Sequence, residues 1–583
     1  MNAQLSIREI QGERLTAEQT AYLDGMFAGL QNRGVRFADV EPNPAGAPRQ
    51  DLETLILEER VKRELHPLDS YPALIECAES NSAPEKENIF RFKWHGLFYL
   101  TPRKEAFMAR LRIPGGQLKT FQLRELAAVS RDLTTGYVQV TSRANIQLRL
   151  IEPRNAPEVL RRIQSVGLNT RGTGADNIRN ITTHPTAGID RHELLNTLPL
   201  CQQLADIIQH DRSFFDLPRK FNIALDGGGS VGVLEDGNDI GLKAVRLSES
   251  AGSLPPGVYF RVALGGATGH KTFARDLGVL VKPEQALKVV VALIRVFIAN
   301  GNRGDRKKAR LKHLLEGWSL ERYLEETESL LGFRLARSSE LAKTAITSEE
   351  KGRRRIAHPH VGVFGQKQAG LNYVGVGLPV GEITPKQMFR LADLADHYGS
   401  GEARLTVWQN VIIPNVPDGF VEPLKKALVR MGLDWRQSNL RSGIVACTGN
   451  SYCKFAAANT KRHGLELGLY LEKRLELDQP LNIHVTGCPN SCAQHYIGDI
   501  GLLGTQVKVG GEPKEAYHVF VGGGFGENQA VGRQVFHGIS FEQLKPTLEK
   551  MLRAYLRHRA AGESFQDFAK RHDLNALQTL FSE

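Results

Sequence analysis

Four of the six cysteines in this 583-residue chain lie between positions 447 and 492. They form one Cys-x5-Cys pair and one Cys-x3-Cys pair: Cys447, Cys453, Cys488 and Cys492. Clustered cysteines at these spacings indicate an iron–sulfur cluster. Zinc sites usually leave two to four residues between paired cysteines, so a gap of five fits zinc less well. Disulfides would need an oxidising compartment, and no secretory signal is visible. Cys77 and Cys201 have no motif around them, and we expect them in the core.

The sequence around each cysteine pair predicts a strand, a turn and then a helix. Residues 443–447 and 481–485 favour strands, and a Thr-Gly turn lies near the end of each. A helical pattern that begins at Ser451 places Cys453 in its first turn, and Cys492 enters a second predicted helix. The free N–H groups and the dipole at a helix N-terminus lower thiol pKa values. This environment would favour an anionic, thiolate-bound cluster.

The strings CTGNSYC and HVTGCPNSC resemble the cluster motifs of the siroheme/[4Fe–4S] nitrite and sulfite reductase family, closest to its ferredoxin-type assimilatory nitrite reductases. The resemblance runs from about residue 90 to about residue 530. It implies that the four cysteines hold a [4Fe–4S] cluster and that Cys492 also bridges to the siroheme iron. It also implies a three-lobed α+β fold with a pseudo-twofold internal duplication. The central domain would consist of two ferredoxin-like half-units, flanked by two α/β cofactor domains.

An internal repeat supports a duplication. Residues 114–168 align without gaps with residues 379–433, at a constant offset of 265. Each copy is predicted to contain a Pro-x-Gly turn, a helix, a strand and a second helix. The predicted strands and following helices are Val138–Leu150, Ala156–Val166, Arg404–Pro414 and Phe420–Met431. An ungapped match of this length indicates a duplicated α+β unit.

The resemblance and the repeat together divide the chain into six parts. We expect an N-terminal extension (1–88), a first ferredoxin-like half-unit (89–168), a first α/β domain (169–301), a helical linker (302–358), a second half-unit (359–433) and an iron–sulfur/siroheme domain with C-terminal helices (434–583). The linker holds two basic runs: Arg303, Arg306, Lys307, Lys308, Arg310 and Lys312, then Lys351, Arg353, Arg354 and Arg355. These residues either lie on a solvated surface, where they could dock a partner, or face the cofactor.

Arginines are dense in the first half of the chain. They stand at predicted strand ends and turns, with one lysine: Arg110, Arg112, Arg143, Arg149, Arg179, Arg219 and Lys220. An isolated arginine is usually solvated, but siroheme carries eight carboxylates that need charge-assisted hydrogen bonds when buried. The resemblance implies that the substrate contacts Arg110, Arg179, Lys220 and Asn222. It implies that Arg143 and Arg219 bind siroheme carboxylates, and Arg149 is a further candidate.

One motif separates the two substrates of the family. Its sulfite reductases typically have Lys-x-Lys where its nitrite reductases have Lys-x-Asn, and this chain has Lys220-Phe221-Asn222. A doubly charged sulfite favours a second cation, whereas singly charged nitrite does not. The resemblance therefore implies six-electron reduction of nitrite to ammonia. Reduction of sulfite to sulfide is the alternative.

The charge balance bears on the partners. With 75 basic and 64 acidic residues the net charge is +11, which suits an anionic cofactor inside or an acidic electron carrier outside. A nucleic-acid-associated protein with a four-cysteine metal site is the non-enzyme alternative, but no nucleic-acid-binding motif is present. The glycine runs lack a GxGxxG fingerprint, so we expect electrons from ferredoxin or flavodoxin. No apolar run is long enough to predict a membrane span. We expect a cytoplasmic monomer.

Overall fold

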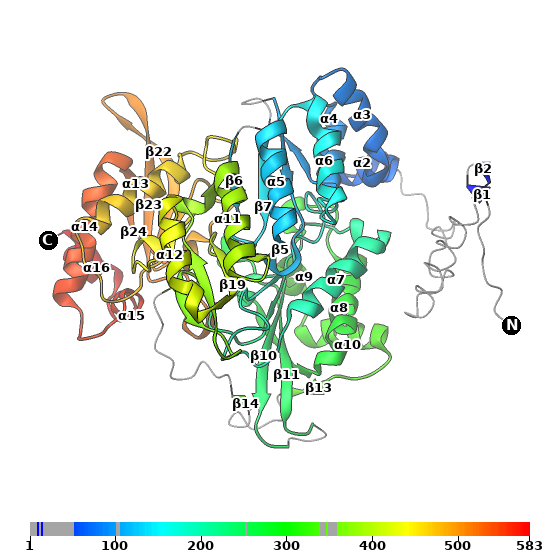
Figure 1. The fold of residues 1–583 in the computed structure, drawn as a ribbon. Helices are drawn as coiled ribbons and strands as arrows, with labels where there is room; N and C mark the ends of the chain where they lie inside the picture. The colour runs from blue at the N-terminus through cyan, green and yellow to red at the C-terminus, as the bar shows by residue number, and fades with distance from the viewer. Residues whose placement is uncertain are drawn as a thin grey trace. The chain divides into compact units, whose positions relative to one another are not determined.

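The computed structural model describes residues 9–10, 13–14, 52–100, 105–134, 136–250, 254–338, 346–347 and 358–582. The chain divides into two compact units, residues 1–55 and 56–583. In the first unit, β1 (Glu9–Ile10) pairs antiparallel with β2 (Glu13–Arg14). All that follows concerns the second unit, whose described strands form four mixed or antiparallel sheets between layers of helices (Figure 1). This arrangement confirms the predicted α+β class.

Two five-stranded sheets contain the predicted half-units. The first has the order β17-β6-β7-β4-β3 and the second β15-β16-β19-β18-β5. Their strands are β3 (Leu97–Tyr99), β4 (Phe107–Arg110), β5 (Gln117–Lys119), β6 (Val138–Val140), β7 (Ile146–Ile151), β15 (Gly362–Gly365), β16 (Leu371–Val376), β17 (Glu382–Ile383), β18 (Glu402–Leu405) and β19 (Val411–Pro417). Their helices are α5 (Thr120–Leu133), α6 (Ala156–Ser165), α11 (Pro385–Tyr398) and α12 (Val421–Arg430). Both ends of α11 and α12 follow those of α5 and α6 at the constant offset of the sequence repeat, which confirms the duplication.

Each half-unit completes the sheet of the other. Strand β5 of the first copy pairs with β18 of the second, and β17 of the second pairs with β6 of the first. The aligned apolar residues of both copies share one core, which includes Leu126 and Leu391. The two copies therefore form one domain rather than two independent ones.

The predicted strands Val138–Leu150 and Arg404–Pro414 are wrong in one respect, because each is a hairpin. The turn is closed by a hydrogen bond from Thr141 N–H to Asn145 O at 2.8 Å, and in the second copy from Thr406 N–H to Asn410 O at 2.9 Å. The third turn residues, Ala144 and Gln409, have φ values of 46° and 61°. Turns with left-handed residues usually announce themselves by Gly or Asn at that position. The two turns have Ala144 and Gln409 at that position instead, so the sequence pattern predicted a continuous strand.

The other two sheets follow the half-units in the chain. The first has the order β13-β12-β11-β10-β9-β8, with β14 on β10, and the second has the order β20-β21-β22-β23-β24. Their strands are β8 (Thr182–Thr183), β9 (Ile223–Asp226), β10 (Ile240–Leu247), β11 (Gly257–Leu264), β12 (Arg275–Val281), β13 (Ala336–Arg337), β14 (Ile346–Thr347), β20 (Ile444–Ala446), β21 (Ile483–Thr486), β22 (Ile500–Val509), β23 (Glu512–Val521) and β24 (Arg533–Ser540). In each sheet three parallel strands precede the antiparallel ones, which number two in the second sheet and four in the first.

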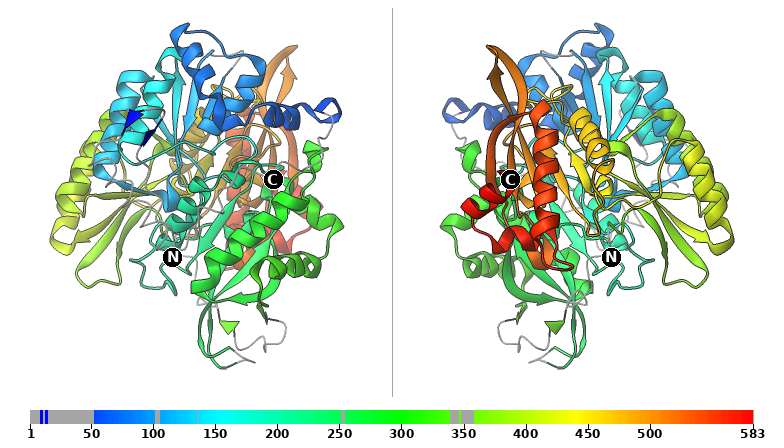
Figure 2. Two further views of the ribbon diagram at one scale, coloured as in Figure 1. Left: turned by 90° about the vertical axis from the view of Figure 1, so that its right-hand side faces the viewer. Right: turned by 90° about the vertical axis from the view of Figure 1, so that its left-hand side faces the viewer.

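Helices complete the cores of these two sheets. The helices near the first sheet are α7 (Leu198–His210), α8 (Ala286–Asn300), α9 (Leu311–Gly317) and α10 (Leu320–Leu331). Those of the second are α13 (Thr460–Glu472), α14 (Phe541–His558), α15 (Phe565–Arg571) and α16 (Leu574–Ser582), the last three red in Figure 2. Three more helices precede β3: α2 (Leu57–Glu64), α3 (Tyr71–Glu79) and α4 (Lys86–Arg91). Helices α9 and α10 bury Leu311 and Tyr323 in the hydrophobic core of the first α/β sheet. The helical part of the predicted linker is therefore not a solvated connection.

The two α/β sheets are also related to each other, by an offset of 260 that the sequence analysis missed. Asn222 N–H donates to Asp239 Oδ2 at 2.8 Å, and Asn482 N–H donates to Asp499 Oδ2 at 2.7 Å. Likewise Ile240 N–H donates to Asn222 O, and Ile500 N–H to Asn482 O. The same hydrogen bonds at the same spacing show that the duplication covers both α/β sheets as well as the half-units.

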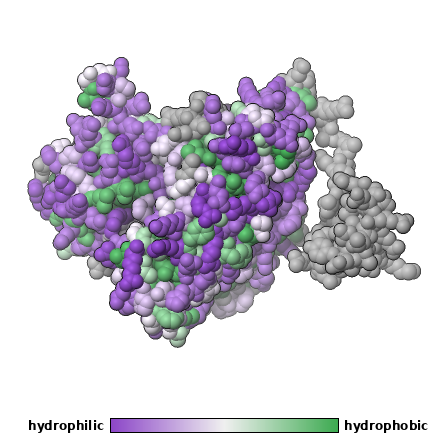
Figure 3. Space-filling view, turned by 45° about the horizontal axis from the view of Figure 1, so that its top comes forward, coloured by the Kyte–Doolittle hydropathy of each residue, from purple (hydrophilic) through white to green (hydrophobic). Residues whose placement is uncertain are grey.

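The surface gives no sign of a membrane span. None of the described helices is long and apolar enough to cross a bilayer. The face in Figure 3 is mostly hydrophilic, with hydrophobic residues scattered over it.

Candidate active site

The two cysteine pairs come together at the end of neighbouring strands. Cys447 directly follows β20, and Cys488 lies two residues after β21, which runs parallel to β20. Cys447 N–H donates to Val485 O at 3.0 Å, and Gly487 N–H donates to Cys447 Sγ at 3.2 Å. In open α/β sheets the carboxyl ends of parallel strands are the usual place for ligands. The structure thus brings the first cysteine of each pair to one edge of the sheet, and their shared role as cluster ligands stays a prediction.

The four thiols are close enough for their charges to interact. The pKa of the Cys492 thiol is raised to about 11, chiefly by burial, with Cys447, Cys488 and Cys453 raising it and Lys220 lowering it. The Cys492 side chain is nevertheless accessible to solvent. Among the described residues, no three Cys, His, Asp or Glu side chains are grouped around a point that could hold a single metal ion.

The predicted helical positions of Cys453 and Cys492 are wrong. Helix α13 begins only at Thr460, capped by the Asn459 side chain, and the residues from 451 to 459 form successive turns. Cys492 lies in a turn before a short 3-10 helix that starts at residue 495. The thiol at the helix start is instead Cys447, whose Sγ lies 3.4 Å from Thr460 Oγ1. The Asn-Thr capping pair was the signal that the sequence analysis missed.

Four arginines from the first half of the chain have no carboxylate partner among the described residues; Arg149 is buried, and Arg110, Arg143 and Arg179 are half-buried. They donate to neutral oxygens: Arg110 to Thr173 O at 3.2 Å, Arg143 to Asn238 Oδ1 at 2.7 Å, Arg149 to Thr448 Oγ1 at 2.7 Å, and Arg179 to Ala175 O at 2.9 Å. Burial lowers the pKa of Arg110, Arg143 and Arg149 to about 10, and that of Arg179 well below its usual value. No described carboxylate forms an ion pair with any of the four. Charge that is withdrawn from water is costly unless compensated, so this group of arginines favours binding of an anion from outside the chain.

Lys220 lies between these arginines and the cysteines. Burial, followed by the charge of Arg310, lowers the pKa of Lys220 to about 7, while Cys492 opposes this and Arg179 and Arg219 reinforce it. An anion bound in the pocket would raise the pKa again and restore the charge on the amine. Arg110, Arg179, Lys220 and Cys492 are therefore close enough for their charges to interact, and their role toward a substrate stays a prediction.

Two further predicted residues have clear surroundings. Asn222 is buried, and its N–H holds the Asp239 carboxylate, to which Arg310 also donates at 2.8 and 2.9 Å. Arg149 lies against the loop between the first two cysteines, through Thr448 and with its guanidinium 5.5 Å from the centre of the Tyr452 ring. The Asp239–Arg310 pair was missed, because no local pattern links two residues so far apart in the chain.

Family comparisons can now be set beside this geometry. The ferredoxin-like half domain of nitrite/sulfite reductases matches residues 101–166 and again residues 364–431. The 4Fe-4S domain of nitrite and sulphite reductases matches residues 174–335 and 437–583. The chain belongs to the nitrite and sulphite reductase family. Membership confirms the predicted resemblance and overturns the alternative of a nucleic-acid-associated metal protein.

Individual members of the family match most of the chain. The ferredoxin–nitrite reductase of Synechococcus elongatus is 37% identical over 470 residues, covering 79% of this chain and 88% of that protein. The ferredoxin–nitrite reductase of Leptolyngbya laminosa is 36% identical over 482 residues, covering 80% and 90%. The solved structure of the NirA protein of Mycobacterium tuberculosis matches with a TM-score of 0.81 and 29% identity, covering 90% of this chain and 97% of that one.

The residues present fit the cofactors of the nitrite and sulphite reductase family, siroheme and a [4Fe–4S] cluster. The four uncompensated guanidiniums match a tetrapyrrole that carries eight carboxylates. The Thr486 hydroxyl, two residues before Cys488, is buried with no hydrogen-bond partner among the described residues. Both observations indicate a site shaped around a bound group rather than a closed protein core.

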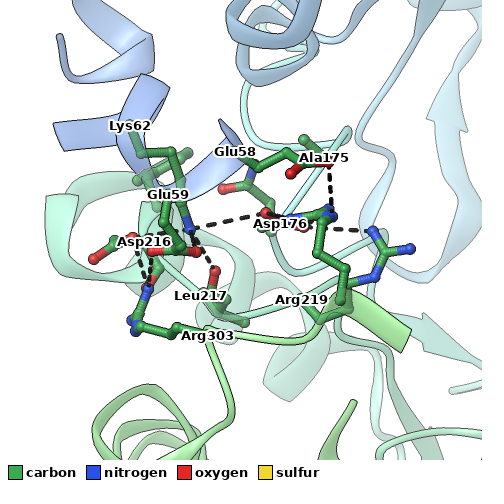
Figure 4. A network of polar contacts seen from close by, with 12 residues as sticks. Glu58, Glu59, Lys62, Ala175, Asp176, Asp216, Leu217, Arg219 and Arg303 are labelled. Atoms are coloured by element: carbon green, nitrogen blue, oxygen red, sulfur yellow. Dashed lines mark hydrogen bonds and ion pairs between the residues drawn. The ribbon is translucent and has the colours of Figure 1, made fainter. Parts of the chain in front are cut away.

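The first basic run predicted as a docking surface is largely internal. Arg303 pairs with Glu59 and Asp216 at 3.1 Å each, and Arg306 donates through two nitrogens to the two oxygens of Asp176, both at 2.8 Å (Figure 4). Arg310 holds Asp239, as described above. Lys307 and Lys308 are exposed. The second run, from 351 to 355, lies outside the described residues. Arg303, Arg306 and Arg310 all form ion pairs with acidic residues from distant parts of the chain. The spacing of the arginines in the sequence does not reveal those partners.

One acid joins this network to the cofactor residues. Asp176 is fully buried and also lies 3.6 Å from Arg219 and 3.8 Å from Lys62 of α2 (Figure 4). The network therefore fixes Arg219 and the chain that leads into Lys220. A similar fixing role falls to Arg112, which donates to the backbone carbonyls of residues 171, 172, 178 and 179.

Asp176→Asn should destabilise the protein by about 3 kcal/mol, since removing one partner of a buried ion pair leaves cations uncompensated. It should also lower siroheme occupancy, because Arg219 loses its anchor. Unfolding curves of the apoprotein and the visible absorbance of the purified protein measure the two effects. The control is Glu158→Gln, which removes an exposed pair with Arg161 and should change neither. Full siroheme occupancy in the Asp176 variant would show that Arg219 needs no such anchor.

Proposed function

We propose that this protein reduces nitrite to ammonia at a siroheme coupled to a [4Fe–4S] cluster, with electrons from reduced ferredoxin. The observation that carries the proposal is the group of four arginines without carboxylate partners, buried or half-buried, beside Lys220 and the four-cysteine site. Two relatives that match about four-fifths of the chain are named ferredoxin–nitrite reductases. The Lys220-x-Asn222 motif favours nitrite over sulfite.

Each predicted side chain takes a role that its surroundings support. Cys447, Cys453, Cys488 and Cys492 would hold the cluster, and Cys492 would also serve the siroheme. Arg143, Arg149 and Arg219 would bind siroheme carboxylates through charge-assisted hydrogen bonds. Arg110, Arg179, Lys220 and Asn222 would face the substrate. Siroheme and the cluster supply the electron-transfer chemistry when bound.

The chain itself contributes charge and protons. Nitrite is an anion that must leave water to enter the pocket, and fixed cations such as Arg110 and Arg179 offset that cost. Reduction to ammonium consumes six electrons and eight protons and releases two waters. Lys220 is a candidate proton donor, because an anion bound beside it would keep its amine protonated. Asn222 adds hydrogen bonding without another charge.

A steady-state comparison tests the substrate. We expect nitrite to have the higher kcat/KM when a chemical reductant supplies the electrons to the purified protein, with sulfite as the competing substrate. A higher kcat/KM for sulfite would reverse the proposed order and make sulfite reduction the function.

The electron donor leads to a prediction about salt. Docking of an acidic ferredoxin on a basic protein is steered by charge, so turnover should fall as salt shortens the Debye length to about 10 Å at 0.1 M. With a small uncharged reductant, turnover should change little. Nitrite reduction is measured with each donor from well below to well above roughly 0.1 M salt. Equal responses would mean that the net charge of +11 serves the buried cofactor rather than a docking face.

The structure narrows the set of residues that could dock ferredoxin. Lys307 and Lys308 are the exposed members of the first basic run, and they are the candidates that we retain. We also propose that the protein is a cytoplasmic monomer. Its mass in solution, against 64.6 kDa for one chain, tests the oligomeric state.

A further inference from the structure

The internal duplication relates the active site to a second place in the molecule. The half-units repeat at an offset of 265 and the α/β sheets at 260, with equivalent backbone hydrogen bonds as described above. The same operation can be applied to each residue of the active site. Every such residue then has a positional equivalent, which we call its mate.

The mates of five basic residues of the site, and of Asn222, carry no charge. Arg110, Arg143 and Arg149 correspond to Gly375, Trp408 and Pro414, and Arg219, Lys220 and Asn222 correspond to Gln479, Pro480 and Asn482. Asn222 alone keeps its residue type. This second place therefore lacks the cations that a polycarboxylate cofactor needs.

The cluster ligands have also been replaced. Gly227 N–H donates to His184 Nδ1 at 3.2 Å, as Gly487 N–H does to Cys447 Sγ, so His184 is the mate of Cys447. At the offset that this pair defines, the mate of Cys453 is Asp190, which accepts hydrogen bonds from the Thr186 hydroxyl and Ser230 N–H. His184 in turn lies 3.1 Å from Glu193 Oε2. His184 and Asp190 each have hydrogen-bond partners within the chain. The equivalent of the cluster site is therefore filled by protein side chains.

The equivalent of the active-site pocket is open. A cavity of about 420 Å³ lies there. Five mates of active-site residues line it: Trp408, Gln479, Pro480, Asn482 and Gly232, the last of which corresponds to Cys492 at the offset of 260. Cavities of this size hold small organic molecules.

Two polar atoms in its wall lack a partner. Gln479 Nε2 and Asn482 Oδ1 are buried and have no hydrogen-bond partner among the described residues, and both side chains are more than nine-tenths buried. Buried polar groups are nearly always hydrogen-bonded, so an unmatched donor and an unmatched acceptor in one cavity wall indicate a ligand that supplies both.

The rest of the lining defines the chemistry of that ligand. Asp226 and Glu235 are buried carboxylates, and the lysine in the lining, Lys243, lies 3.8 Å from Glu235 Oε1. Burial and the nearby Asp226 raise the pKa of Glu235 well above its usual value. A cationic group entering the cavity would relieve this repulsion.

The cavity also has an aromatic side. Trp408 stacks on His360 with the rings 6° from parallel, and its ring centre lies 5.2 Å from that of Phe525. All three residues line the cavity. Aromatic walls favour planar rings and cations, and the acidic end favours a donor group.

We propose that this cavity is a second ligand site, which takes a small planar aromatic or heteroaromatic molecule bearing a cationic amine or amidine group. The amine end would meet Asp226 and Glu235, and the ring would pack against Trp408 and Phe525. Gln479 and Asn482 would provide one donor and one acceptor to the ring substituents. The site is separate from the nitrite pocket and does not depend on its chemistry.

Matched probes test the charge preference. Benzamidine and benzoate share a shape and differ in charge, so calorimetry of the purified holoenzyme with each distinguishes the site from non-specific binding. We expect benzamidine to bind one per chain, without competing with nitrite, and benzoate to bind at least tenfold more weakly. Absence of benzamidine binding, or equal affinity for the two probes, would overturn the proposal.

Variants locate the binding. Asp226→Asn keeps an acceptor for Gly228 N–H but removes the charge, and we expect it to weaken benzamidine at least tenfold. Gln479→Leu removes the unmatched donor, which lies away from the acidic end of the cavity. We expect this variant also to weaken the binding of benzamidine. Asp393→Asn, at an exposed carboxylate, is the matched control and should leave binding unchanged. Benzamidine binding that survives both cavity variants would place the probe elsewhere and refute this site.

Discussion

Cys492→Ser is expected to lower nitrite turnover by at least about 100-fold, since changes merely adjoining metal ligands already cost 10–100-fold. The reason is that, under the proposed function, one thiolate would serve two cofactors. It would complete the cluster with Cys447, Cys453 and Cys488, and its charge interacts with that of Lys220. Iron content per chain, the visible absorbance of siroheme and steady-state turnover measure the loss.

The matched control is Cys77→Ser. Cys77 is buried in the core and donates a hydrogen bond to Ser82 O at 2.8 Å, which a serine hydroxyl can replace. We expect the iron content and spectrum of this variant to match those of the parent protein. A Cys492 variant with full iron, an unchanged spectrum and normal turnover would rule out the shared thiolate.

Local patterns were sufficient to predict the half-units. The helices α5, α6, α11 and α12 follow from apolar periodicity and from an ungapped repeat, both of which are properties of neighbouring residues. The exchange of β5 and β17 between half-units could not be predicted in this way. Strands this short carry almost no pattern, and the partner of each belongs to the other half of the duplication. Pairing at that distance is decided by the assembled core.

The second duplication escaped for a related reason. It is kept in main-chain hydrogen bonds, such as those of Asn222 and Asn482 to their aspartates, rather than in residue types. Where function differs between the copies, the residues have changed most: Cys447 has His184 as its mate, and Lys220 has Pro480. A repeat preserved in backbone geometry is visible only once the strands are paired.

Charge was the hardest property to place. The sequence singled out Arg110, Arg143 and Arg179 through the family resemblance, and their roles stay predictions. It gave no means of seeing that Arg303 and Arg306 point inward, since their acidic partners belong to α2 and to loops far along the chain. Whether an arginine is solvated or buried depends on those distant acids, and local spacing does not report them.

Asn222→Lys should shift substrate preference from nitrite toward sulfite. The new ammonium would lie in a pocket that already holds Lys220 and several buried arginines, and a doubly charged substrate compensates it better than nitrite does. We expect nitrite turnover to fall and the sulfite-to-nitrite ratio of kcat/KM to rise by about tenfold, which corresponds to roughly 1.4 kcal/mol of differential transition-state binding. Steady-state kinetics with both substrates and one chemical reductant give the ratio.

The duplication supplies the control for this variant. Asn482 is the mate of Asn222, equally buried and with the same backbone hydrogen bond, but it faces the acidic cavity rather than the arginines. Asn482→Lys therefore introduces the same side chain in the same backbone setting without changing the charge of the active site. Its ratio should equal that of the parent protein. If both variants changed the ratio alike, the effect would come from burying a lysine in this fold, and Asn222 would lose its role as the residue that discriminates nitrite from sulfite.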